Sequence, residues 1–98
     1  MPGEPVVLIN AFEVPAGEDE AFLVSWERSR EFLRTQPGYL STRLHRSLSP
    51  TADFRFINVA LWESADAFRA ATSRPEFRDN PNPNRFHASL YEVVRADT

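Results

Sequence analysis

Hydrophobic and polar residues alternate along four stretches of this 98-residue chain, which is the pattern of strands with one buried face. The predicted strands cover residues 6–14, 39–48, 54–63 and 86–95. In the second strand, strict alternation places five side chains on one face: Leu40, Thr42, Leu44, Arg46 and Leu48.

Between the first two strands the hydrophobic period lengthens to three and four residues, which predicts a helix from Glu18 to about Thr35. Acidic residues at 18–20 suit the start of this helix, because a helix N-terminus favours negative charge. One stripe of the helix is expected to face the core: Phe22, Trp26, Ser29 and Leu33.

After the third strand, Ser64 is suited to cap a second, shorter helix that ends near Thr72. This helix is expected to bury Ala67, Phe68 and Ala71. Prolines at 75, 81 and 83 predict a loop over 73–85, with one turn around 76–78.

The element order βαββαβ predicts an α+β, ferredoxin-like fold, with an antiparallel four-stranded sheet and two helices on one face. Residues 1–98 are expected to form a single domain, with its core at about 6–94. Because the strands carry apolar residues on both faces, the uncovered face predicts a two-fold homodimer.

Two asparagines lie in otherwise apolar rows of the first and third strands. The two rows are Val6, Leu8, Asn10 and Phe12, and Phe56, Asn58, Ala60 and Trp62. An amide in such a row needs hydrogen-bond partners, and ligand pockets are mostly apolar with a few polar groups. The pattern indicates a dry pocket, although each asparagine alone is equally consistent with a structural hydrogen bond to a loop.

Composition narrows the chemistry. The net charge of −3 gives no electrostatic reason for binding nucleic acid or an anionic membrane, and a cytoplasmic location is expected. The chain has no cysteine, and all 11 basic residues are arginine, so thiolate and Schiff-base lysine chemistry are excluded. The two histidines, His45 and His87, share no ligand-like spacing, and no metal site is expected.

Four stretches resemble the antibiotic biosynthesis monooxygenase family: VLINAF at 7–12, QPGYL at 36–40, FINVALWES at 56–64 and AF at 67–68. With the element order, the resemblance covers about 6–94 and implies a dimeric α+β barrel. The asparagine and tryptophan pattern is closest to cofactor-independent anthrone oxygenases of aromatic polyketide biosynthesis.

That resemblance implies a cofactor-independent monooxygenase that oxidises a polycyclic phenolic or anthrone-like substrate to a quinone with molecular oxygen. Asn10, Asn58 and Trp62 match the catalytic positions of that group. Four aromatic residues are predicted to contact the substrate: Phe12, Trp26, Phe56 and Phe68. His87, as a base, and the loop at 75–85, as a lid, are further candidates.

Two other interpretations stay open. Haem-degrading monooxygenases look similar over the same length, and Asn10 matches them, but their tryptophan and histidine positions fall on Ala71 and about Pro81. The chain is alternatively a non-catalytic dimeric binding or accessory domain with structural asparagines. A pocket filled by its own aromatic residues would favour that last interpretation.

Overall fold

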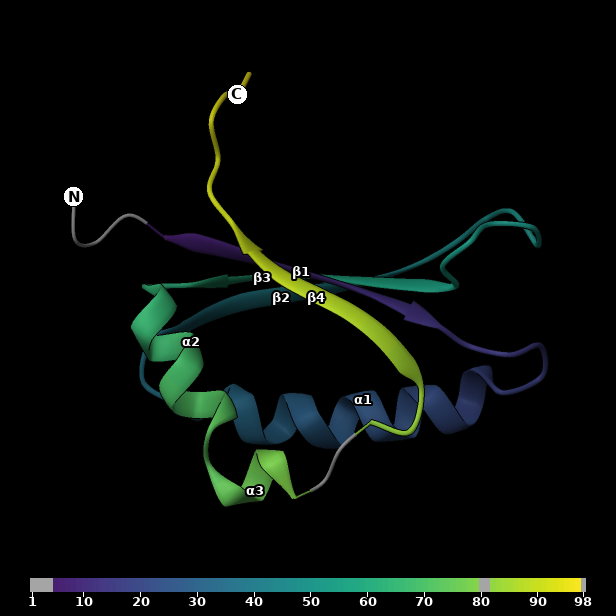
Figure 1. The fold of residues 1–98 in the computed structure, drawn as a ribbon, viewed down its shortest axis with the longest axis horizontal. Coiled ribbons are helices and arrows are strands. Elements are labelled where there is room, and N and C mark those ends of the chain that lie inside the picture. Colours follow the sequence, from purple (N-terminus) through teal and green to yellow (C-terminus); the bar gives the residue numbers. More distant parts are fainter. Residues whose placement is uncertain (1–4, 80–81, 98) are drawn as a thin grey trace.

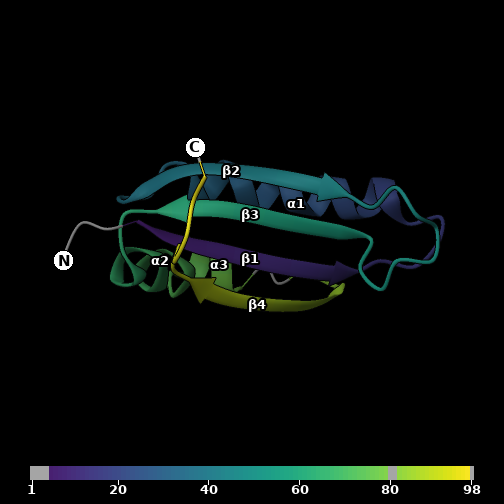
Figure 2. The ribbon, with the colours of Figure 1, turned by 90° about the horizontal axis from the view of Figure 1, so that it is seen from above.

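The computed structural model describes residues 5–79 and 82–97, which form one antiparallel sheet with helices on one face (Figures 1 and 2). The sheet order is β2-β3-β1-β4, as the ferredoxin-like prediction requires. The elements are β1 (Val6–Glu13), α1 (Asp19–Leu33), β2 (Tyr39–Arg46), β3 (Phe56–Trp62), α2 (Ala65–Thr72), α3 (Pro75–Arg78) and β4 (Arg85–Tyr91).

The helix boundaries follow from local chemistry. Ser64 caps α2 as predicted, because its Oγ accepts a hydrogen bond from the Ala67 N–H at 3.1 Å. The turn predicted around 76–78 is the short helix α3, which has Pro75 in its first turn. None of the described helices combines the length and apolar character needed to cross a bilayer.

A β-bulge in β2 changes which side chains face the helices. Tyr39 pairs with Trp62 and Ser41 pairs with Leu61, which is adjacent to Trp62 in β3. Leu40 is therefore the extra residue of β2. Tyr39 therefore shares the face of Trp62, and Leu40 is 46% exposed. The prediction that Leu40 shares a face with Thr42 was wrong.

Two predicted strands extend too far. β2 ends at Arg46, and Leu48 lies fully exposed in the following turn instead of on the inner face. β4 ends at Tyr91 instead of residue 95, and the chain after it leaves the sheet on the side away from the helices (Figure 1). Alternation of apolar residues did not reveal these ends, because Val93 and Val94 are exposed outside any strand.

The core consists of two clusters between the sheet and the helices. One contains Leu8, Ala60, Trp62 and Ala71, at the α2 end. The other contains Phe12, Phe22 and Phe56, at the start of α1. The strand positions between the two clusters are those of Asn10 and Asn58, so the polar pair separates two apolar regions.

The opposite side of the sheet, here the open face, has no helix of the described residues against it (Figures 1 and 2). Its central apolar side chains come from β1 and β3: Val7, Ile9, Ala11, Ile57, Val59 and Leu61. Histidines and Arg43 flank this apolar strip on the outer strands.

Candidate functional site

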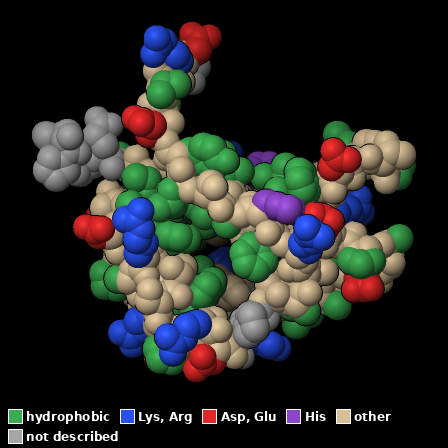
Figure 3. Space-filling view, viewed as in Figure 1, with side chains coloured by type: hydrophobic (Ala, Val, Ile, Leu, Met, Phe, Trp, Pro, Cys, Tyr) green, Lys and Arg blue, Asp and Glu red, His purple; other side chains and the backbone are tan. Residues whose placement is uncertain are grey.

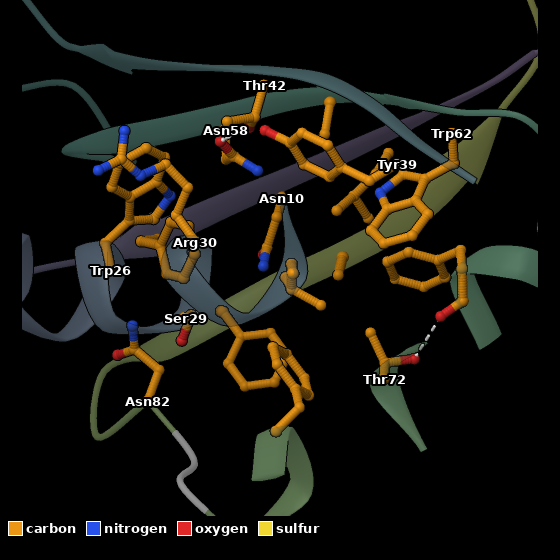
Figure 4. Close-up of a pocket in the computed structure, with 18 of the residues that line it drawn as sticks. Asn10, Trp26, Ser29, Arg30, Tyr39, Thr42, Asn58, Trp62, Thr72 and Asn82 are labelled. Atoms are coloured by element: carbon orange, nitrogen blue, oxygen red, sulfur yellow. Dashed lines mark hydrogen bonds between the residues drawn. The ribbon is translucent and has the colours of Figure 1, made fainter. Parts of the chain in front are cut away.

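A cavity of about 410 Å³ lies between the sheet and the helices, and the molecular surface is hollowed there (Figures 3 and 4). This volume is within the range of roughly 300–1,000 Å³ that small-molecule sites occupy. Its wall is mostly aromatic and aliphatic, with contributions from all four strands and all three helices. A small, mainly apolar ligand suits such a cavity.

Asn10 and Asn58 lie directly opposite each other in the pairing of β1 with β3, and both line the cavity. Asn58 is 9% exposed, and its Oδ1 accepts a hydrogen bond from Thr42 Oγ1 at 2.7 Å. Since Thr42 fixes the carbonyl, the amide N–H₂ of Asn58 is directed away from Thr42. Figure 4 shows this nitrogen on the side of Asn10.

Asn10 differs from Asn58 in its hydrogen bonding. Its Oδ1 is buried and has no hydrogen-bond partner among the described residues. A buried carbonyl without a donor is costly, by about 1–3 kcal/mol. Figure 4 shows the amide of Asn10 projecting from the sheet into the cavity. A buried polar atom that destabilises the fold in this way suggests that Asn10 serves ligand binding instead of folding.

Trp62 forms one end of the cavity and is 1% exposed. Its indole makes edge-to-face contacts with Tyr39 at 5.5 Å and with Phe68 at 5.6 Å between ring centroids. These contacts fix the indole plane, so Trp62 is both a core residue and a rigid wall of the site.

Three of the four predicted substrate contacts, Phe12, Trp26 and Phe68, line the cavity. Phe56 does not. It is buried and stacks on Phe22 with ring centroids 4.5 Å apart, so α1 covers it from the cavity. The sequence correctly placed Phe56 on the same face of the strand as Asn58. It did not reveal where α1 crosses the sheet and covers that side chain.

His87 lies away from the cavity. It pairs with Ala11 in the β1–β4 register, which places it on the open face, and its Nε2 lies 2.7 Å from Glu13 Oε2. His45 is also exposed, with its Nδ1 3.2 Å from the Ile57 carbonyl oxygen. Among the described residues no cluster of three or more metal-binding side chains exists.

Several lining residues were not singled out from the sequence. The bulge brings Tyr39 into the cavity, and burial raises the pKa of its hydroxyl while the charges of Arg30 and Arg34 oppose that shift. Arg30 lies one turn after Trp26, with its guanidinium 5.6 Å from the Trp26 ring centroid. The four-residue spacing from Trp26 to Arg30 was the signal that could have placed Arg30 at the cavity. An arginine beside Ser29 on a helix is, however, expected to be solvated.

The position that haem-degrading relatives would fill with tryptophan holds Ala71, which is buried in the core cluster with Trp62. The position expected for their histidine, about Pro81, lies outside the described residues. Among the described residues that line the cavity there is no histidine.

Known proteins resemble the chain in sequence and fold. A heme oxygenase (mycobilin-producing) of Mycobacterium tuberculosis is 34% identical over 92% of this chain and 90% of its own length. Deoxynogalonate monooxygenase of Streptomyces nogalater is 34% identical over 76% of this chain and 60% of its own length.

Among solved structures, a protein of Shewanella loihica PV-4 assigned as a monooxygenase matches with a TM-score of 0.86 and 41% identity, over 95% of this chain and 97% of that one. SnoaB, a cofactor-independent oxygenase from Streptomyces nogalater, matches with a TM-score of 0.81 and 26% identity, over 95% and 96%. Residues 5–80 match the model of the antibiotic biosynthesis monooxygenase family. This chain therefore belongs to the antibiotic biosynthesis monooxygenase family.

Proposed function

We propose that this protein is a cofactor-independent monooxygenase that oxidises a polycyclic phenolic or anthrone-like substrate to a quinone with molecular oxygen. The observation that carries the proposal is the pair Asn10 and Asn58, which is placed in an otherwise apolar cavity between two aromatic core clusters. Similarity to deoxynogalonate monooxygenase and to SnoaB supports the same class of reaction.

The chemistry uses the substrate as its own reductant, since ground-state oxygen reacts readily only with one-electron donors. The anthrone methylene loses a proton to give an enolate, which transfers one electron to oxygen. The substrate radical and superoxide combine as a carbon-bound peroxide, which takes up a proton to become a hydroperoxide. Loss of water then leaves the quinone carbonyl.

The protein contributes orientation and stabilisation of the enolate oxygen. Asn58, held by Thr42, and Asn10 donate N–H groups to that oxygen, and Trp62 aligns the ring. Among the described lining residues there is no carboxylate or histidine, so solvent accepts the proton.

Oxygen uptake with dithranol tests this proposal. We expect the metal-stripped protein to accelerate uptake and quinone formation over a no-protein control. Asn10→Ala and Asn58→Ala should each lower the rate about a hundredfold, the magnitude seen when a donor to a developing oxyanion is removed. Ser89→Ala, on the open face of β4, is the matched control. Normal turnover by both asparagine variants would refute the assigned roles.

A homodimer through the open face is part of the proposal. The apolar strip from Val7 to Leu61 lies uncovered, together with exposed Tyr91, and a large uncovered apolar patch normally marks an interface. Sedimentation velocity should give the mass of a dimer. Val59→Arg, at the centre of the strip, should give a monomer, whereas an unchanged dimer would place the interface elsewhere.

Haem degradation is the second candidate, and similarity to the Mycobacterium tuberculosis heme oxygenase favours it. The heme-degrader MhuD, whose structure has two hemes bound in its active site, matches with a TM-score of 0.72 and 29% identity. Titration with hemin separates the candidates. A shifted Soret band with saturable binding would support haem as a ligand, whereas an unshifted band would exclude it.

A pocket filled by Trp26, Trp62 and Phe68 would have favoured the non-catalytic alternative. These side chains instead surround about 410 Å³ of space, which supports ligand binding. A folded dimer that binds anthrones without accelerating oxygen uptake would restore that alternative.

A further inference from the structure

The charges around the cavity have one sign. Among the described residues that line it, the charged side chains are Arg30 and Arg78, with no aspartate, glutamate or histidine. The molecule as a whole carries a net charge of −3, so the positive charge of this lining is opposite in sign to the net charge of the protein. A cavity of this kind attracts a negatively charged ligand, because opposite charge is stabilised where the wall is otherwise apolar.

Arg30 is the better placed of the two arginines. Its guanidinium lies over the Trp26 ring, 5.6 Å from the centroid, and Figure 4 shows both side chains at the end of the cavity away from Trp62. Arg78 lies on α3, is two-thirds exposed and pairs with Asp79 at 3.6 Å. Stacking on an aromatic ring holds a guanidinium in one orientation without neutralising it.

The protein satisfies only part of the Arg30 guanidinium. Its Nη2 donates to Glu31 Oε2 at 3.0 Å, and Glu31 is 61% exposed, so this contact is on the solvent side. Its Nε is buried and has no acceptor among the described residues. A guanidinium whose Nε lacks an acceptor still has capacity for an anionic oxygen, because guanidinium and carboxylate or phenolate oxygens pair strongly.

The charge of Arg30 reaches the interior of the site. Burial raises the pKa of the Tyr39 hydroxyl, and the positive charges of Arg30 and Arg34 oppose part of that rise. The titratable or charged groups around Arg30 are Glu31 on α1, Arg34 at the C-cap of α1, Tyr39 on β2 and Arg78 on α3. Glu31 also pairs with Arg34 at 3.5 Å, so its charge is shared between two arginines.

We propose that Arg30 is a specificity-determining residue that selects the ionised form of a flat aromatic ligand, with the anionic oxygen against the guanidinium and the ring beside Trp26. The inference rests on the proposed function and deepens it. The described lining holds no carboxylate or histidine, so the proton passes to solvent, and stabilising the bound anion shifts the acid–base equilibrium of the substrate toward the enolate. Arg30 thereby favours the enolate through its charge, without itself accepting the proton.

Binding of alizarin, a planar hydroxyanthraquinone that is not consumed by oxygen, tests the proposal without turnover. Its absorption moves to longer wavelength when the phenol ionises, so the spectrum reports the protonation state of the bound dye. We expect the apparent pKa of alizarin to fall on binding to the wild-type protein. Arg30→Gln should abolish that fall and weaken binding of the ionised dye about tenfold, the loss typical of a charge-assisted hydrogen bond.

Arg34→Gln is the matched control, since Arg34 caps the C-terminus of the same helix and also pairs with Glu31 but does not line the cavity. Because its charge acts on the site only from a distance, it should change the dye pKa and affinity much less than Arg30→Gln does. Arg30→Lys keeps the charge without the planar fork and should retain part of the shift. Circular dichroism checks that each variant is folded. An equal loss in Arg30→Gln and Arg34→Gln, an unshifted dye pKa, or no binding by the wild-type protein would each overturn the proposal.

Two competing ligands distinguish the source of the anionic oxygen. Anthraquinone-2-carboxylate is ionised throughout the accessible pH range, and its displacement of alizarin in an Arg30-dependent manner would assign the site to carboxylates as well. Displacement by 1-hydroxyanthraquinone alone would assign it to phenolates. If the wild-type protein binds the dye in an Arg30-dependent manner but does not accelerate oxygen uptake with dithranol, only the oxygenase proposal is refuted. If it accelerates uptake but binds the dye equally well with and without Arg30, only this inference is refuted.

Discussion

Asn10 and Asn58 face each other across the pairing of β1 with β3, yet only Asn58 has a hydrogen bond to its carbonyl oxygen, from Thr42. The two amides therefore contribute differently to stability. Asn58 belongs to a satisfied pair, whereas Asn10 is buried at a cost that the fold does not recover. If both asparagines serve the reaction, substitution of Asn10 should lower activity without lowering stability. Substitution of Asn58 should lower both.

Replacement of Asn10 by valine should leave the free energy of unfolding unchanged or raise it by about 1 kcal/mol. The reason is that the buried, unpaired Oδ1 disappears, and valine favours strands. Oxygen uptake should fall in the same variant. Urea unfolding measured beside uptake with dithranol checks both. A loss of stability above about 2 kcal/mol would mean that the Asn10 carbonyl has a structural partner in solution.

Replacement of Thr42 by valine should destabilise the protein by about 1–2 kcal/mol, because the buried Oδ1 of Asn58 then loses its donor. Turnover should fall as well, since the Asn58 amide is no longer held in one orientation. Thr42→Ser keeps the hydroxyl and is the control. If valine and serine behave alike in both measurements, the hydrogen bond does not orient Asn58.

Much of this site follows from the period of the strands. Alternation alone assigned Asn10, Asn58, Phe12 and Trp62 to one face, because their strands run without interruption through the register. The covering of Phe56 by Phe22 was not readable, because it depends on where α1 crosses the sheet. The strand order could be predicted from the order of the elements, because strand–helix–strand connections are right-handed.

Tyr39 and Arg30 show two different reasons why sequence reasoning stops short. Tyr39 enters the cavity only because β2 has a bulge before Ser41, and a bulge shifts every side chain before it by one position. Arg30 enters because its long side chain folds back over Trp26, and helical periodicity gives the position of a Cβ but not of a guanidinium.

Acid should weaken the attachment of α1 to the sheet. Arg55 donates to Asp19 with Nη2–Oδ2 at 2.8 Å, and this hydrogen bond holds the pKa of the Asp19 carboxyl below its usual value, with burial opposing it. A lowered folded-state pKa gives stability that is present above the unfolded pKa, about 3.9 for aspartate. That stability is lost as the pH falls through the folded value.

Urea midpoints measured between neutral pH and pH values below that range check this expectation. The wild-type protein should lose stability on acidification more steeply than Asp19→Asn. The control is Asp66→Asn, which removes an almost fully exposed carboxylate paired with Arg69 at 3.6 Å. Identical acid profiles for wild type and Asp19→Asn would show that the Arg55 pair does not contribute.

Gly38 and Gly17 provide a last, internally controlled prediction, because both have a left-handed backbone, with φ of +90° and +85°, but different surroundings. A Cβ at Gly17 would meet open space, so Gly17→Ala should cost only the backbone strain, about 1 kcal/mol. A Cβ at Gly38 would collide with the Cβ of Ala67 on α2, beside the hydrogen bond from the Glu63 N–H to the Gly38 carbonyl. Gly38→Ala should therefore cost about 1–3 kcal/mol more, by pushing α2 from β2. Urea unfolding of the two variants checks the difference, and equal losses would show that α2 moves without cost.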